Sequence, residues 1–167
     1  MKRMMVVAVL MVVCITWAIA AGWAATDQQT LTINATVADK AKLTLGTAAI
    51  SFPDADPDST PSIAAPENPV SVTVKAHAGT GSLVTLTVQA NGNLGSGIDD
   101  TIAISNVTWT AFGSGFVAGT MGTSPVAAGS WTGSGNRSGS FSYFLANSWA
   151  YPKGDYTQTV VYTLTAP

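Results

Sequence analysis

The sequence contains little cysteine, histidine or charge. Its 167 residues include one Cys and one His, and only 10% of them are charged. A lone cysteine excludes an internal disulfide and any metal site built from several thiolates. The net charge of −2 leaves no basic surface to neutralise phosphates, which argues against nucleic-acid binding. Because titratable groups are so few and scattered, we expect no enzymatic activity and no cofactor.

The first 24 residues predict a Sec-type secretory signal peptide. Lys2 and Arg3 precede an apolar stretch, residues 4–20, which is followed by small residues. Cleavage after Ala24 fits best and cleavage after Ala20 comes next, while a transmembrane anchor is the alternative. Cleavage removes Cys14, so we expect a secreted or cell-surface protein without cysteine and without a stable membrane span. Residues 25–167 then form one domain.

The rest of the chain alternates between apolar and polar residues, as β-strands do. Clear examples are residues 30–37, 70–77, 84–90, 141–145 and 156–165. Gly, Asn, Asp and Pro separate these runs, as in Asn91-Gly92-Asn93. About eight short strands with polar turns favour an all-β sandwich, and a closed barrel is the alternative.

Two stretches depart from simple alternation. In residues 101–112 the apolar phase changes near Ser105 and Asn106, which predicts a β-bulge there. Residues 113–140 are rich in Gly, Ser and Thr. We expect this stretch to be a long excursion with one or two short strands, near residues 116–121 and 130–132.

Few residues suggest binding chemistry. The alternating Asp54, Asp56 and Asp58 could supply oxygen ligands to Ca²⁺, although a solvated Pro/Asp turn is the simpler interpretation. His77 falls on the polar face of its strand and is expected at the surface. Trp109 follows the apolar phase of its strand and is expected in the core. Glycosylation acceptor patterns begin at Asn34, Asn106 and Asn136.

Trp149 and Tyr151 precede Pro152 in a predicted turn, where aromatic rings could stack on a sugar. A packed corner is the alternative interpretation. These rings support a second functional hypothesis, in which the protein is a self-contained extracellular sandwich that binds a glycan or another protein, as adhesins and matrix proteins do.

Both ends of the mature chain resemble a known family. The last strand opens with Gly154-Asp155-Tyr156 and continues as Thr157-Gln158-Thr159-Val160-Val161-Tyr162-Thr163-Leu164-Thr165. This pattern, together with an alternating N-terminal segment at residues 25–38, resembles the spore coat U-like and archaic chaperone–usher pilin subunits. The chain lacks the early cysteine pair of the classical pattern.

The resemblance implies an incomplete immunoglobulin-like sandwich of about seven to nine antiparallel strands. One strand is missing, and the N-terminal arm of a neighbouring subunit fills the resulting groove. Leu31, Ile33, Ala35 and Val37 would be the groove-filling side chains. The resemblance further implies a homo-oligomer or fibre (a fimbrium or coat), with a periplasmic chaperone and an usher as possible partners.

Burial of the arm is favourable whichever groove receives it. Leu31, Ile33 and Val37 would each contribute about 1.5–3 kcal/mol on full burial, and Ala35 less. This free energy favours closure within one chain and between chains alike. The sequence therefore leaves open whether residues 25–38 pair in cis or in trans.

Overall fold

The computed structural model describes residues 27–97 and 99–167, so the expected signal peptide lies outside the described residues. The chain divides into two units, residues 1–35 and 36–167. The second unit carries the strands, which are β1 (Lys40–Leu45), β2 (Ser62–Ala64), β3 (Val70–His77), β4 (Leu83–Ala90), β5 (Leu94–Gly95), β6 (Thr101–Ile102), β7 (Val107–Phe112), β8 (Gly119–Thr120), β9 (Val126–Thr132), β10 (Gly135–Ala146) and β11 (Val160–Thr165). Among the described residues, no helix has the length and apolarity needed to span a membrane.

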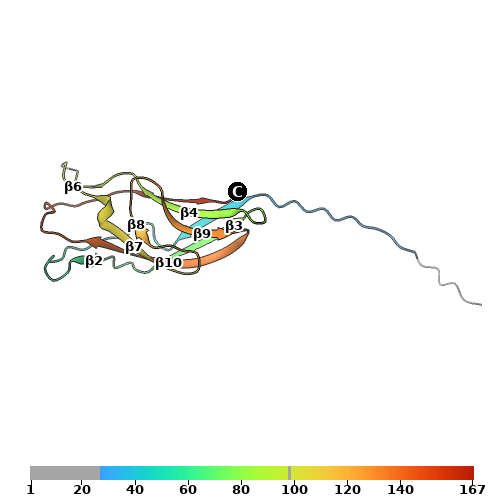
Figure 1. Ribbon diagram of the computed structural model, residues 1–167, viewed down its shortest axis with the longest axis horizontal. Helices are drawn as coiled ribbons and strands as arrows, with labels where there is room; N and C mark the ends of the chain where they lie inside the picture. Colours follow the sequence, from blue (N-terminus) through green and yellow to red (C-terminus); the bar gives the residue numbers. More distant parts are fainter. Residues whose placement is uncertain (1–26, 98) are drawn as a thin grey trace, which may run out of the picture. The chain divides into compact units, whose positions relative to one another are not determined.

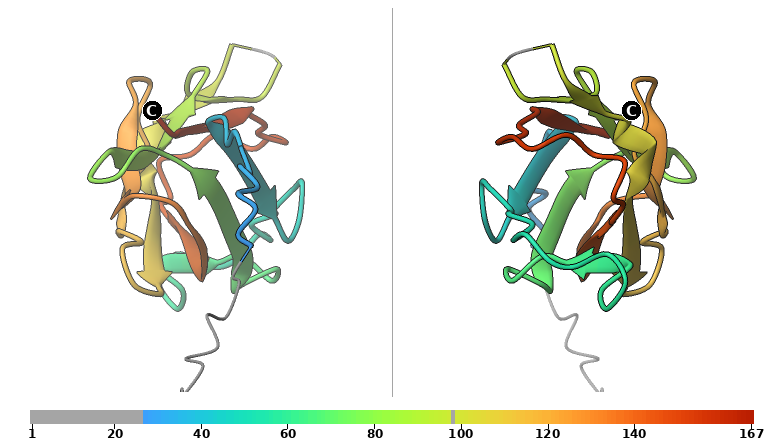
Figure 2. Two further views of the ribbon diagram at one scale, coloured as in Figure 1. Left: turned by 90° about the vertical axis from the view of Figure 1, so that its right-hand side faces the viewer. Right: turned by 90° about the vertical axis from the view of Figure 1, so that its left-hand side faces the viewer.

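Nine of the strands form two antiparallel sheets that pack face to face, which confirms the predicted all-β sandwich (Figures 1 and 2), and β5 pairs with β6 in a separate two-stranded sheet. The larger sheet has the order β1-β3-β10-β7-β8, with β2 paired to one end of β10, and the smaller has the order β11-β4-β9. In an immunoglobulin domain, strands A, B, E and D form one sheet, and C pairs with F in the other. The larger sheet here has the same order as A, B, E and D, with β1, β3, β10 and β7 in their places. In the smaller sheet β4 pairs with β11 as C pairs with F.

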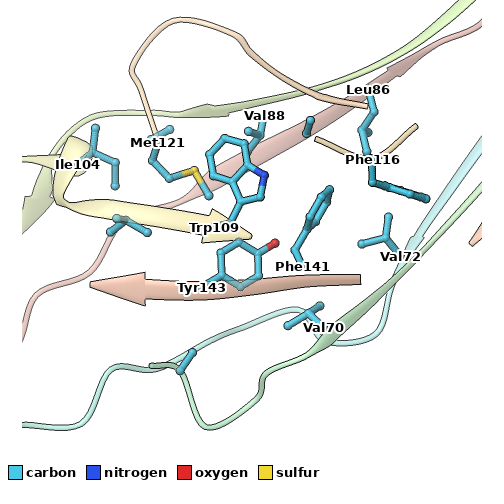
Figure 3. Packing of buried hydrophobic residues seen from close by; sticks show 14 of the residues in the cluster. Val70, Val72, Leu86, Val88, Ile104, Trp109, Phe116, Met121, Phe141 and Tyr143 are labelled. Carbon is cyan, nitrogen blue, oxygen red and sulfur yellow. The ribbon is translucent and has the colours of Figure 1, made fainter. Parts of the chain in front are cut away.

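Alternation along the strands builds the core between the sheets. In β3 the residues Val70, Val72, Val74 and Ala76 are buried, and β4 buries every second residue in the same way. Aromatic rings fill the centre, where Trp109 meets Phe141 edge to face at a centroid distance of 6.4 Å (Figure 3). Trp109 is only 2% exposed and His77 is exposed, as the sequence predicted for both.

Residues 113–140 are more regular than predicted. They contain the seven-residue strand β9 and the start of the twelve-residue β10. The alternation of apolar and polar residues is weak here because glycines stand at inward positions. Large aromatic rings fill the space next to these glycines. A Cβ on Gly129 would meet the ring of Trp131, and a Cβ on Gly139 would lie 2.6 Å from Phe116 Cε2. Trp131 and Phe116 pack edge to face at 4.9 Å.

Two local predictions are wrong in detail. The phase change near Ser105 is produced by a 3-10 turn, Ile104–Asn106, and the irregularity typical of a β-bulge lies instead between Leu86 and Thr87. Residues 30–37 form no strand, because no neighbouring strand pairs with them among the described residues.

The strand registers define two ends of the sandwich in residues 36–167. At the hairpin end, Lys40 pairs with His77, Leu83 pairs with Thr132, and the Gly79 backbone N–H donates to Pro167 O at 3.2 Å. The loop end carries the connections at residues 53–61, 91–97 and 147–159. The β1 strand therefore starts, and β11 finishes, at the hairpin end.

Candidate functional site: a groove beside β11

The β11 strand is the least covered strand of the smaller sheet. In the smaller sheet β11 pairs with β4 only, and no described residue pairs with its other edge. In an immunoglobulin domain this is the place of strand G, next to F. The consequence is a gradient of burial, because the inward residues of β4 are fully buried while Val160, Tyr162 and Leu164 of β11 are only half-buried.

The edge of the other sheet is open on the same side. The β1 strand ends the larger sheet, and its inward residues Leu43 and Leu45 are half-buried as well. The chain then continues from β1 through residues 47–53, which face β11 across a cavity of about 1170 Å³. Ligand pockets usually enclose about 300–1,000 Å³, so this space is large enough for several side chains. We call this space the β11 groove.

Apolar residues form the floor of the β11 groove. The larger sheet contributes Ile63, Val107 and Tyr143, while Ile102 comes from the short strand β6 and Met121 directly follows β8. All five are buried members of the main core. A side chain entering the groove would therefore extend the existing core.

A pair of tyrosines links the two sheets at the floor of the groove. The hydroxyl oxygens of Tyr143 on β10 and Tyr162 on β11 lie 2.7 Å apart. Tyr162 also stacks on Phe141, with ring centroids 6.1 Å apart and planes 18° apart. Burial raises the pKa of Tyr162, and the neighbouring Tyr143 raises it further, so both hydroxyls stay protonated and able to share this bond.

The wall at residues 47–53 is anchored by one carboxylate. The Ser51 backbone N–H donates to a Glu67 carboxylate oxygen at 3.1 Å, and Ser51 Oγ donates to the other oxygen at 2.8 Å. The bond from the Ser51 backbone is the main reason that the pKa of Glu67 lies below its ordinary value. Ile50 and Phe52, on either side of Ser51, pack against the core.

The opposite side of the sandwich is closed by the chain itself. The Val117 backbone N–H donates to Ala128 O at 3.0 Å, and the Ser130 N–H donates to Gly115 O at 2.9 Å. These bonds join the β7–β8 connection to β9, and Trp131 Nε1 adds a bond to Ser114 O at 2.8 Å. The β11 side has no such closure among the described residues.

The side chains predicted to fill a groove lie in the other unit or at its boundary and are unburied. Leu31 is 82% exposed, Ile33 84% and Val37 75%, and Ala35 is exposed as well. Exposed apolar residues at alternate positions are costly in water, so the arm has a surface to bury. The sequence predicted the alternating arm and a strand at residues 156–165. It did not indicate that residues 47–53 form a wall, or that floor residues from separate segments meet beside β11.

The other candidate residues form a small polar corner at the loop end. Asp56 Oδ1 accepts a bond from the Asp58 backbone N–H at 2.9 Å, and Asp58 Oδ1 accepts one from Trp149 Nε1 at 3.1 Å. Trp149 is nonetheless 71% exposed, and Tyr151 is half-buried. Within residues 27–97 and 99–167, no group of three or more acidic, His or Cys side chains is arranged to hold a metal ion.

No protein-family model matches the chain, and a comparison with curated proteins finds no significant match.

Proposed function

We propose that this protein is an exported structural subunit of a surface fibre or coat, and that copies join when the arm of one copy, residues 27–37, fills the β11 groove of another. The observation that carries this proposal is the half-buried, unpaired edge of β11 beside a large apolar groove. An added strand would pair with this edge through its backbone and insert alternate side chains into the groove.

The arm and the edge match in length and pattern. Leu31 to Val37 spans roughly 20 Å when extended, which is close to the length of the six-residue β11. Its four alternate apolar residues would face the groove, while Thr30, Thr32, Asn34 and Thr36 would face outward. The polar residues would then lie on the solvent side of the completed sheet.

The direction of insertion decides what is built. The β11 strand finishes at the end where β1 starts, so an arm that runs antiparallel to β11 enters its neighbour with its own sandwich beyond the loop end. Copies then follow one another head to tail, which builds an open filament. A parallel arm would bring two hairpin ends together and allow a closed, reciprocal dimer.

Pairing in cis is disfavoured by the short connection. An arm that filled its own groove would have to turn into β1 through Ala38 and Asp39 alone, since β1 begins at Lys40. Two-residue turns between antiparallel strands favour residues such as Asn-Gly that adopt positive φ, and Ala38 is a poor choice there. An arm that filled its own groove would also have to run parallel to β11. We therefore propose pairing in trans, with the arm antiparallel.

The test compares two charged substitutions in the arm of the mature protein, residues 25–167. Ile33→Asp places a charge on the groove-facing side, where burial without a partner is costly, so we expect filaments to disappear. Thr32→Asp adds the same charge on the outward side and should leave assembly intact. Electron microscopy and sedimentation measure both. Equal assembly of the two variants would contradict the proposal.

A second candidate function is binding of a glycan or protein at the loop end, and the exposed Trp149 favours it. Its indole edge is fixed by Asp58, which leaves the ring face free for stacking. Glycan binding that is lost in Trp149→Ala, in a protein that does not form filaments, would support this function over the first.

A further inference from the structure

Charge is distributed unevenly in the unit of residues 36–167. The loop end carries six aspartates and one lysine, namely Asp54, Asp56, Asp58, Asp99, Asp100, Asp155 and Lys153. The remaining basic residues of the unit, Lys40, Lys42, Lys75 and Arg137, lie on β1, β3 and β10 toward the hairpin end. Asp39, next to Lys40, is acidic, but four basic residues outweigh it, so the hairpin end is positive and the loop end negative.

Two of the basic residues repel one another where they are placed. On the outer face of the larger sheet Lys42 pairs directly with Lys75. Like charges opposite each other destabilise a sheet. Lysines on an edge strand guard against unwanted pairing, which explains Lys40 and Lys42 on β1. This reason does not apply to Lys75, because β3 is an inner strand.

The acidic residues lie at the opening of the β11 groove. Asp54 and Asp56 follow the wall at residues 47–53, Asp155 precedes β11, and all three line the groove. All three are exposed. An antiparallel arm would leave the groove at this end, and Lys40 follows Val37 by only three residues, or about 10 Å of extended chain. Head-to-tail insertion would thus bring Lys40 and Lys42 to these aspartates.

We infer that the lysines after the arm, Lys40 and Lys42 with Lys75 beside them, form an interface with the aspartates at the groove opening of the next copy, Asp54, Asp56 and Asp155. This inference rests on the proposed function and names the second contact of the same joint. Opposite charges speed the encounter of correctly ordered ends, and two hairpin ends or two loop ends repel. Charge thereby selects the head-to-tail order.

The test is a charge exchange in the mature protein, with assembly followed by light scattering at several salt concentrations. Lys40→Glu/Lys42→Glu and Asp54→Lys/Asp56→Lys should each slow assembly at least tenfold at low salt, because steering by charge changes association rates by about 10–1,000-fold. The protein carrying all four substitutions should recover most of the wild-type rate. High salt should reduce the difference between wild type and variants.

A matched control separates local contact from net charge. Lys40→Gln/Lys42→Gln and Thr108→Glu/Thr110→Glu lower the net charge by the same amount. Thr108 and Thr110 are exposed residues of β7, which is an inner strand of the larger sheet between β10 and β8. Only the lysine variant should assemble slowly. Binding of a synthetic arm peptide, residues 27–38, to the protein lacking those residues reports on the proposed function separately. If the peptide binds and all charge variants assemble at the wild-type rate, the interface is wrong and the groove is not. If the peptide does not bind, both are wrong.

Discussion

At the scale of single residues, the hydroxyl bond between Tyr143 and Tyr162 is a polar link within an apolar floor. It joins the larger sheet to the least covered strand of the smaller one. Both side chains are otherwise surrounded by apolar core residues, so each hydroxyl depends on the other for a partner. The link fixes the distance between the sheets where the added strand is proposed to lie.

Tyr162→Phe should therefore destabilise the protein when no added strand fills the β11 groove. The substitution leaves the Tyr143 hydroxyl without its partner in a largely buried place, which costs about 1–3 kcal/mol. Urea unfolding of the protein lacking residues 25–38 measures the loss. Tyr151→Phe is the control, because its hydroxyl donates to Ala146 O at an exposed site and should matter less. If the two variants lose the same free energy of unfolding, the bond between Tyr143 and Tyr162 contributes no more to stability than an exposed hydroxyl bond.

Glu67 makes one part of the stability depend on pH. Its pKa lies below the ordinary value because the charged form accepts bonds from Ser51. A lowered folded-state pKa stabilises the fold above the unfolded-state value of about 4.5, and this contribution is lost as the pH falls through the folded-state value.

Glu67→Gln should lower the melting temperature at pH 7, and the difference from wild type should shrink below about pH 4.5, where the carboxylate of the unfolded chain becomes protonated. Melting curves between pH 2.5 and pH 8 measure it. Ser51→Ala should reproduce part of the effect, since it removes the bond from Ser51 Oγ to Glu67 and leaves the bond from the Ser51 backbone. A difference that stays constant across this range would contradict the assignment.

Gly139 tests why the sequence pattern fails in residues 113–140. A Cβ there would meet the backbone oxygen of Phe112 and lie 2.6 Å from Phe116 Cε2, so Gly139→Ala should cost about 1–3 kcal/mol through overpacking. Gly95→Ala is the matched control, because nothing lies within 4 Å of its added Cβ. Chemical unfolding of both variants gives the comparison. Equal stability of the two would mean that the ring contact does not require glycine.

At the scale of elements, the sequence predicted the strands whose alternation has a clear cause. The β3, β4 and β11 strands each place every second residue toward the core, and each was recognised from that period. The β9 strand was not recognised at its full length, because Ala127, Ala128 and Gly129 carry too little side chain to show a face. The ring of Trp131 occupies the space where a side chain at Gly129 would lie, and such packing is not visible in a local pattern.

The groove itself could be predicted only in part. One wall is the regular strand β11, but the other wall, residues 47–53, is irregular and is held by a contact between Ser51 and Glu67, sixteen residues apart. The floor collects Ile63, Ile102 and Met121 from separate segments. Only the fold brings these together. The arm is a prediction from its alternation, and no strand among the described residues pairs with it.

At the scale of the whole molecule, the sandwich of residues 36–167 is closed on one side and open on the other. The closed side uses backbone bonds between the β7–β8 connection and β9, and the open side offers an unpaired strand edge above apolar residues. An exposed strand edge invites pairing with other chains unless it is protected. The proposed assembly uses this property, with direction set by the strands and order favoured by charge.

The most direct measurement is a pair of distances in the complex of a spin-labelled arm peptide with the protein lacking residues 25–38. Residues 25–167 contain no cysteine, so labels can be placed by Thr36→Cys in the peptide and by Thr159→Cys or Thr165→Cys in the protein. Electron–electron double resonance should give the shorter distance to position 159, with position 165 farther by up to roughly 20 Å along the strand. The reverse order, or no complex at all, would contradict head-to-tail assembly through the β11 groove.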